Sequence, residues 1–347
     1  MTQVWYCTRE DVKHATAAEE TVWNNRQIDR AIAAGTEAVE SLTHRRFYPE
    51  FATRYFDWPN EQDATPWRLW LNQHELIEVT TLEVAGVALS PNDFFLYPQG
   101  GPPYNRVEIN LAGSAAFSGG ATHQRAIGIA GLFGHSAKQA PAGVLAEGLD
   151  ASETTVDVSD SAAIGVGQLI KVGSERMQVT GKAMLDTGQT LQAVMPSEDN
   201  HEMCVVSNGA AYSMGETILV DAEKMLIQEI AGNTLIVERA YDASTLAAHT
   251  GSTIYAPRTL TVERGVLGTT AAEHAISTAI VKHVPPSLAR DLCIAEAQNT
   301  LYQEASGYAR QIGRGETARE VFARALRDLR SQVYDSLGRH SRMRTVV

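Results

Sequence analysis

The chain has 347 residues, of which 44% are hydrophobic, and a formal net charge of −12. This length allows two or three domains, and the apolar content is ordinary for a globular protein. The negative charge excludes a protein that coats nucleic acid through a basic face.

The cysteines and the N-terminus indicate the compartment. Cys7, Cys204 and Cys293 are odd in number and widely spaced, which fits neither a disulfide framework nor a zinc knuckle. The N-terminal residues are polar and charged, unlike a secretory signal, and no apolar run is long enough to span a membrane. We therefore expect synthesis in a reducing cytoplasm and no contact with a membrane.

Two helices are predicted at the N-terminus. Thr8 and Asp11 form a capping-box pattern that predicts a short helix to about Ala18. A longer helix is predicted from Asn24 to Thr43, and Gly35 within it indicates close approach of a neighbouring element. Its apolar face consists of Ile28, Ile32, Val39 and Leu42.

The stretch from His44 to Pro59, "HRRFYPEFATRYFDWP", has two interpretations. Aromatic rings among arginines are typical of a platform that stacks on single-stranded nucleic acid, and also of a packed elbow between a helix and a strand. The acidic charge of the chain favours the elbow, with Phe47, Tyr48, Tyr55, Phe56 and Trp58 buried between the bundle and the β domain or against a neighbouring subunit. Candidate subunit-interface residues, where arginines meet carboxylates of a neighbouring copy, are Arg45, Arg46, Phe47, Tyr48 and Arg54.

The middle of the chain has strand patterns. Residues 55–137 alternate apolar and polar residues between Gly- and Pro-rich loops, which predicts an antiparallel β domain with a turn at Ala85-Gly86. Residues 138–284 contain repeats: Gly167–Val179 aligns without gaps with Gly215–Ile227, and Asn233–Ile254 aligns with Arg258–Ile280. We expect tandem β modules here.

The repeats place Arg239 over Arg264 and His249 over His274. The histidines are either paired metal ligands or one structural position that occurs twice, and the second interpretation is the simpler one. Glu238 and Glu263 are expected to be exposed on strands.

Two more helices are predicted at the C-terminus. Pro285 and Pro286 precede the first helix, with Ser287 as its N-cap, and Gly338 ends the second. From residue 310 onward nine arginines face four acids, which gives +5 and leaves −17 for the rest of the chain. A basic tail on an acidic body suggests docking on an acidic partner, although terminal disorder is the alternative.

The chain shows no catalytic pattern. Its Gly-rich stretches lack the Lys-Ser/Thr of a phosphate-binding loop, and His201 has no second histidine at helical metal-site spacing. No Ser-His-Asp or Cys-His arrangement can be argued. We expect no enzyme activity, no cofactor and no metal.

The predicted fold class is α+β. N- and C-terminal helices would form one helical bundle, with an antiparallel β domain and inserted duplicated β modules between them. The expected segments are the first bundle helices, the β domain, the tandem β modules, the last bundle helices and an extended basic tail, at 1–54, 55–137, 138–284, 285–338 and 339–347.

Four stretches together resemble the head-to-tail connector, or adaptor, proteins of long-tailed bacteriophages. They are "YCTREDVKHA", "NNRQIDRAIAAGTEAVESLTHRRFYP", "ATRYFDWPN" and "VPPSLARDLCIAEAQNTLYQ". In that family two helices end in an Arg-Phe-Tyr-Pro elbow, and a helix opening with a Pro-x-x-Leu turn completes a bundle. Residues from about Lys138 to His283 depart from its shorter members and look like an insertion.

The resemblance implies a structural virion protein of the viral neck. It would form a ring, expected to be a homododecamer, between the portal and the stopper or tail completion protein, and be made in the host bacterial cytoplasm. DNA would pass through during ejection without sequence-specific binding, which suits an acidic channel. The family's C-terminal segment docks on the portal, so the portal-binding candidates are Arg327, Arg330, Arg339, Arg342 and Arg344.

Two other functions remain open from the residues. A phage surface β protein could bind a carbohydrate or host receptor, but the repeats contain only three unevenly placed tyrosines, Tyr212, Tyr241 and Tyr255. A hydrolase in the β region is the other, and the sequence offers no carboxylate pair for it.

Overall fold

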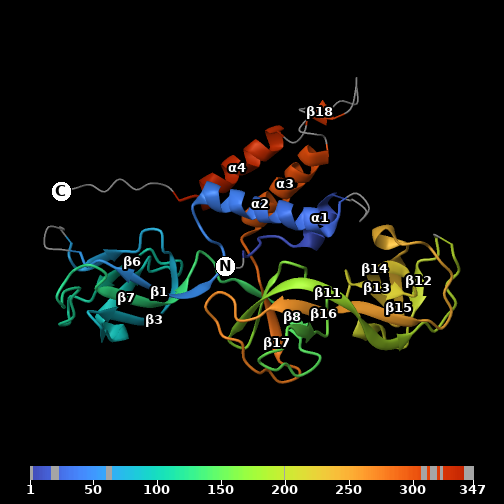
Figure 1. The fold of residues 1–347 in the computed structure, drawn as a ribbon, viewed down its shortest axis with the longest axis horizontal. Helices are drawn as coiled ribbons and strands as arrows, with labels where there is room; N and C mark the ends of the chain where they lie inside the picture. The colour runs from blue at the N-terminus through green and yellow to red at the C-terminus, as the bar shows by residue number, and fades with distance from the viewer. Residues whose placement is uncertain are drawn as a thin grey trace.

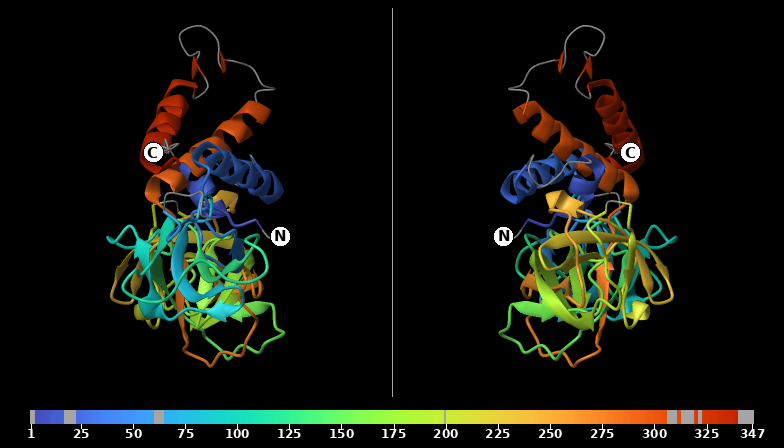
Figure 2. Two further views of the ribbon diagram at one scale, coloured as in Figure 1. Left: turned by 90° about the vertical axis from the view of Figure 1, so that its left-hand side faces the viewer. Right: turned by 90° about the vertical axis from the view of Figure 1, so that its right-hand side faces the viewer.

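The structure is a computed structural model that describes residues 3–16, 23–59, 65–198, 200–305, 311–312, 319–320 and 323–339. About 36% of the chain is strand, and four helices are present in the described part. The helices lie together on one side of the molecule, above three β units that follow one another in a row (Figure 1). The two side views in Figure 2 show the same separation into a helical layer and a β body.

The predicted fold class is wrong. The chain is mostly β, its largest element is a ten-stranded antiparallel sheet, and the terminal helices do not form a bundle from which the β region departs. The physical reason is visible in the core beneath the helices, which includes Leu169 and Val266 of the β body and Val4 and Tyr6 of the N-terminal segment. The helices bury their apolar faces partly on strands and loops, so they are a layer on a β protein.

The helical layer contains α1 (Arg9–Thr16), α2 (Asn25–Thr43), α3 (Ser287–Ala305) and α4 (Ala323–Leu337). The Asn24 side chain and Gln27 form a capping box at the start of α2. Gly35 of α2 faces α3 so closely that an added Cβ would lie 2.8 Å from the Cys293 carbonyl oxygen. The close approach predicted at this glycine is confirmed.

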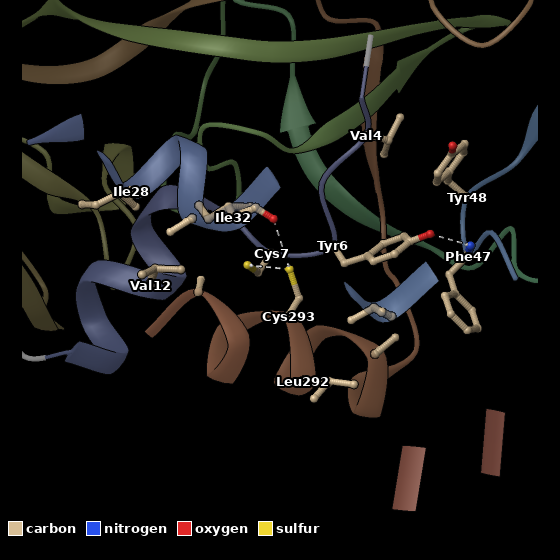
Figure 3. Packing of buried hydrophobic residues seen from close by; sticks show 14 of the residues in the cluster. Val4, Tyr6, Cys7, Val12, Ile28, Ile32, Phe47, Tyr48, Leu292 and Cys293 are labelled. Atoms are coloured by element: carbon tan, nitrogen blue, oxygen red, sulfur yellow. Dashed lines mark hydrogen bonds between the residues drawn. The ribbon is translucent and has the colours of Figure 1, made fainter. Parts of the chain in front are cut away.

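The N-terminal segment threads through the core of the helical layer (Figure 3). The Tyr6 hydroxyl donates to Glu40 at 2.8 Å and accepts from the Phe47 amide at 3.0 Å. The Cys7 thiol donates to Cys293 Sγ at 3.4 Å, and this bond together with burial raises the pKa of Cys7 well above its usual range. The segment therefore ties α2, α3 and the residues after α2 together.

The β domain has two antiparallel sheets. One has the order β1-β7-β3-β4 and the other β2-β6-β5, with a shared core that includes Leu71, Val107 and Ile129. The predicted turn at Ala85-Gly86 joins β3 to β4, with positive φ at both residues. The strands are β1 (Glu50–Phe56), β2 (Arg68–Trp70), β3 (Leu76–Val84), β4 (Val87–Ala88), β5 (Phe94–Tyr97), β6 (Arg106–Ile109) and β7 (Ile127–Phe133).

The ten-stranded sheet has the order β12-β15-β14-β13-β16-β11-β10-β17-β8, and β9 also pairs with β16. A separate two-stranded sheet joins β18 (Gln311–Ile312) to β19 (Arg319–Glu320). The ten strands are β8 (Gln139–Val144), β9 (Thr155–Asp157), β10 (Leu169–Val172), β11 (Glu175–Thr190), β12 (Met203–Val205), β13 (Thr217–Val220), β14 (Glu223–Ala231), β15 (Thr234–Glu238), β16 (Thr253–Glu263) and β17 (Ala279–His283).

This sheet consists of two modules, one nested inside the other. Module 1 comprises residues 138–183 and 259–283, and module 2 comprises residues 184–258; each has its own apolar core. The long strand β11 begins in module 1 and continues into module 2, and β16 leads from module 2 back into module 1. The modules are therefore not arranged in tandem, as we had expected, because module 2 interrupts a hairpin of module 1.

The pairing registers show where module 2 is inserted. In module 2, β14 and β15 pair up to Ala231 opposite Thr234, and Gly232-Asn233 forms the turn. In module 1, β11 and β16 pair with the same register and the same bulge up to Ala183 opposite Thr259. Module 2 is thus inserted between Ala183 and Thr259 of module 1. The equivalent position of module 2 itself is the two-residue turn Gly232-Asn233.

Candidate interaction surfaces

The elbow after α2 joins the helical layer to both β regions. His44 ends α2 in the left-handed conformation, with φ 53°. Phe47 is fully buried, its ring lies 5.6 Å from that of Tyr6, and its carbonyl oxygen accepts from His283 Nε2 at 2.7 Å. Burial lowers the pKa of His283 to about 4, so this histidine is neutral near pH 7. The elbow is thus a packed junction.

The aromatics of the stretch from His44 to Pro59 do not form a stacking platform. Phe47, Tyr48 and Phe56 are buried and Trp58 is half-buried, whereas Tyr55 is 54% exposed within one chain, so its burial against a neighbouring subunit stays a prediction. The guanidinium of Arg125 lies 5.1 Å from the Tyr55 ring. Phe51, which is 41% exposed, is the other exposed ring among the Phe, Tyr and Trp side chains of the stretch, so two of these six rings face solvent.

The elbow arginines meet carboxylates of their own chain. Arg45 Nε lies 3.1 Å from Glu75, and Arg46 and Arg54 lie 3.5 and 3.0 Å from Glu50. The charge pairing that we expected is present, but inside one protomer. Whether these residues also contact a second copy stays a prediction.

Glu75 connects three parts of the chain. Arg45 from the elbow, His135 after β7 and Arg339 after α4 lie 3.1, 3.1 and 3.7 Å from its carboxylate. Burial raises the pKa of Glu75, but the hydrogen bond with His135 and the two arginine charges outweigh it and lower this pKa. The sequence analysis missed Glu75 because only tertiary structure brings these partners together.

The portal-binding candidates have different surroundings. Arg330 is held by two hydrogen bonds to Glu296 of α3, and Arg339 donates to the carbonyl oxygens of Asn72 and Gln73 at 2.8 and 3.2 Å. Arg327 is exposed on α4. Arg342 and Arg344 lie outside the described residues.

The two modules contain the same buried ionic cluster. In module 2, Arg239 holds Glu223 through two hydrogen bonds of 2.7 and 2.9 Å, and His249 Nε2 lies 2.9 Å from the same carboxylate. In module 1, the equivalent trio is Arg264, Glu175 and His274, with distances of 2.6, 2.7 and 2.9 Å.

The surroundings of both clusters point to a structural role. Each carboxylate also accepts from two backbone amides, and each arginine donates to the carbonyl oxygen eight residues after it, Ala247 or Ala272. The described residues hold no group of three or more His, Cys, Asp or Glu side chains arranged for a metal ion. The repeated histidines thus occupy one structural position twice.

A groove of about 410 Å³ lies where the N-terminal segment, α1 and both modules meet. It contains four lysines and two arginines alongside Glu10, Asp11 and Asp242; the basic residues are Arg9, Lys13, Lys182, Lys224, Lys282 and Arg290. Lys282 Nζ donates to the Ala163 carbonyl oxygen, and burial lowers its pKa. The groove is a basic surface on an acidic chain.

A second hollow of about 650 Å³ lies on the β domain and is mainly apolar. Its walls include Trp58, Trp67 and Phe117, and the neighbouring Leu111 is 69% exposed. In the modules, Tyr212 is buried, whereas Tyr241 and Tyr255 are half-buried, as Trp58 and Trp67 are.

Among the described helices, none has the length and apolar character needed to cross a membrane. Comparisons of the chain with protein-family models, curated proteins and solved structures gave no match. The resemblance to head-to-tail adaptors therefore rests on the residues that suggested it.

Proposed function

We propose that this chain is a structural adaptor of a bacteriophage neck, which assembles into a ring between the portal and the stopper or tail completion protein. Its role is to form interfaces. The resemblance supplies the identity of the partners, and the structure supports the proposal through one observation: Arg339, the last described residue, is fixed to the folded body.

Hydrogen bonds from its backbone and its side chain hold Arg339 in position. Its backbone amide donates to the Thr43 carbonyl oxygen at 3.0 Å, and its guanidinium bonds to the Asn72 and Gln73 carbonyl oxygens beside Glu75. The basic residues that follow, among them Arg342 and Arg344, start from this anchor. An anchored start lowers the entropy cost of docking a terminal segment on an acidic partner surface.

The test is removal of residues 340–347 with Arg339 retained. We expect the truncated chain to keep its unfolding midpoint and its ring, and to lose binding to the portal ring of the virus that encodes it, measured by co-sedimentation. Arg327→Ala changes a portal-binding candidate on the exposed face of α4, and we expect it to weaken portal binding less than the truncation does. Full portal binding by the truncated chain, or a purified chain that stays monomeric with and without portal, would refute the adaptor role.

A second function is favoured by the apolar hollow of the β domain. The half-buried Trp58 and Trp67 at this hollow are suited to stack on sugar rings, as a carbohydrate- or receptor-binding phage surface protein requires. A glycan array with the full chain, repeated with Trp67→Ala, tests it. Glycan binding that Trp67→Ala abolishes would favour this function over the adaptor.

A further inference from the structure

The N-terminal segment is docked on module 1 in a specific way. An added Cβ on Gly167 would lie 2.1 Å from a ring carbon of Trp5, so this glycine is the seat of the indole ring. One residue earlier, the Val166 amide donates to Glu10 Oε2 at 2.8 Å, and the Val166 carbonyl oxygen accepts from the Arg9 amide at 3.0 Å. An aromatic ring, a backbone hydrogen bond and a carboxylate therefore cover one loop of module 1.

Module 2 has the same loop in an uncovered state. Gly215 aligns with Gly167, both have positive φ (84° and 94°), and both amides donate across the module at 2.8 Å, to Ile227 and Val179. No atom lies within 4 Å of an added Cβ on Gly215. Met214, the equivalent of Val166, is 65% exposed, and its backbone forms no hydrogen bond with the described residues.

We propose that residues 213–215 of module 2 bind an extended segment of a partner protein, in the way that residues 165–167 of module 1 bind the chain's own N-terminal segment. The required chemistry follows from module 1. An aromatic ring covers Gly215, and a carboxylate five positions later accepts from the Met214 amide, as Trp5 and Glu10 do on module 1.

The two loops differ at one position, which refines the expected partner. An added Cβ on Gly165 would lie 2.6 Å from both Thr8 Cβ and Glu10 Oε2, and module 2 has Ser213 there, whose hydroxyl donates to Asp160 at 2.9 Å. The partner's carboxylate must reach the Met214 amide from a different position than Glu10 takes on module 1. The partner residue that corresponds to Thr8 must therefore be small. The expected pattern is an aromatic residue, a small residue three positions later and an acid two positions after that.

One observation favours a different protein over a second copy as the occupant. The chain's own segment is committed to its core, with Tyr6 and Cys7 only 1% and 3% exposed, so a second copy would have to expose this core to donate it. Lys182 and Lys224 of the adjoining groove already pair with Glu10 at 3.6 Å and with Asp242 at 3.0 Å, so an incoming carboxylate would share these lysines with them.

The test uses the full chain and a fluorescein-labelled peptide of residues 3–12 with Cys7→Ser and Thr8→Gly. We expect saturable binding by fluorescence anisotropy and at least a tenfold loss of affinity with Gly215→Asn, because asparagine tolerates positive φ and its side chain fills the seat of the ring. Gly232→Asn is the matched control, since Gly232 also has positive φ and open space, in a turn of the same module.

Peptides with Trp5→Ala or Glu10→Gln should bind at least fivefold more weakly. If Gly215→Asn lowers the unfolding midpoint, Met214→Asp at the exposed neighbouring position replaces it, because its carboxylate repels the peptide's acid. The proposal is wrong if the peptide does not saturate, or if it binds the wild-type chain and the Gly215 or Met214 variant equally. The assay involves neither portal nor ring formation, so its outcome is independent of the adaptor proposal.

Discussion

Module 1 and module 2 share a register, a bulge and a buried Glu-Arg-His cluster, yet they differ in their surroundings. Module 1 is covered by the N-terminal segment and contributes Leu169 to the core of the helical layer. No described segment covers module 2 in this way, and its cluster is the more deeply buried: the side chains of Arg239 and His249 are 0% and 1% exposed, against 7% and 8% for Arg264 and His274. The stability of module 1 thus depends partly on contacts with the N-terminal segment and the helical layer, whereas that of module 2 depends more on its own core.

The largest effect should come from removing the central carboxylate. Glu223→Gln leaves the buried Arg239 without a counter-charge, and breaking such a pair costs about 3–5 kcal/mol of unfolding free energy. Glu175→Gln should cost less, because Arg264 retains some access to water. Hydrogen-exchange mass spectrometry resolves the modules, and Glu238→Gln on the exposed face is the control. If Glu223→Gln and Glu175→Gln cause equal losses of hydrogen-exchange protection in their modules, the two clusters do not differ in how much they stabilise their modules.

Acid should destabilise module 2 next. Burial raises the pKa of Glu223, but hydrogen bonds from Arg239, from His249 and from two backbone amides outweigh it and lower this pKa from 4.5 to about 2. Since the folded-state pKa is lowered, the stabilisation is complete above about pH 4.5 and is lost as the pH falls towards 2. We expect about 2 kcal/mol to be lost, after allowance for solvent screening.

The measurement is urea unfolding between pH 6 and pH 2.5, with exchange protection followed in β13 to β15. With Glu223→Gln the remaining acid dependence of this region should shrink, because its main titrating group is gone. Unchanged acid dependence in that variant would show that other carboxylates dominate.

An exchange of one residue between the modules should have a smaller effect. His249 Nδ1 lies 2.7 Å from Asp221, and at the equivalent turn position module 1 has Gly173, whose added Cβ would lie 3.5 Å from His274 Nδ1. Both residues have positive φ, so glycine and aspartate fit either turn. Asp221→Gly should lower the free energy of unfolding by about 1 kcal/mol, and Gly173→Asp should raise it by a similar amount in module 1 near pH 6. Thermal unfolding of the two single variants and the double variant tests this.

These relations indicate what could be predicted from the sequence. The alignment that placed Arg239 over Arg264 and His249 over His274 located both clusters, since a duplicated module repeats its buried polar network. It also contained an unused signal: the repeated segments occur in the order first half, first half, second half, second half. A tandem pair would alternate the halves, so this order already indicates nesting.

Other features were beyond a sequence prediction because they depend on tertiary contacts. Helical periodicity located α2 and the close approach at Gly35, but it could not show that Leu169 and Val266 complete the helical core. That omission produced the wrong fold class. Nothing near Glu75 in the sequence indicates Arg45 or Arg339 as its partners, and the seat of Trp5 on Gly167 joins residues far apart in the chain.

The smallest effect is expected from removing module 2 altogether. The replacement of residues 184–258 by Gly-Asn gives module 1 the turn that module 2 has at Gly232-Asn233. The new asparagine can supply the carbonyl that Arg258 now offers to the Val158 amide at 3.0 Å, because Asn233 does the same for Val206 at 2.9 Å. The separate apolar cores argue that module 1, the helical layer and the β domain keep their stability.

The shortened chain should therefore unfold within a few degrees of the full chain when followed by tryptophan fluorescence, since Trp5 is seated on Gly167 of module 1. Replacement of the same residues by Gly-Pro is the matched control, because proline is disfavoured at the second turn position and cannot adopt the same turn. A shortened chain that fails to fold with Gly-Asn would show that module 1 needs module 2, and that the two are one cooperative unit despite their separate cores.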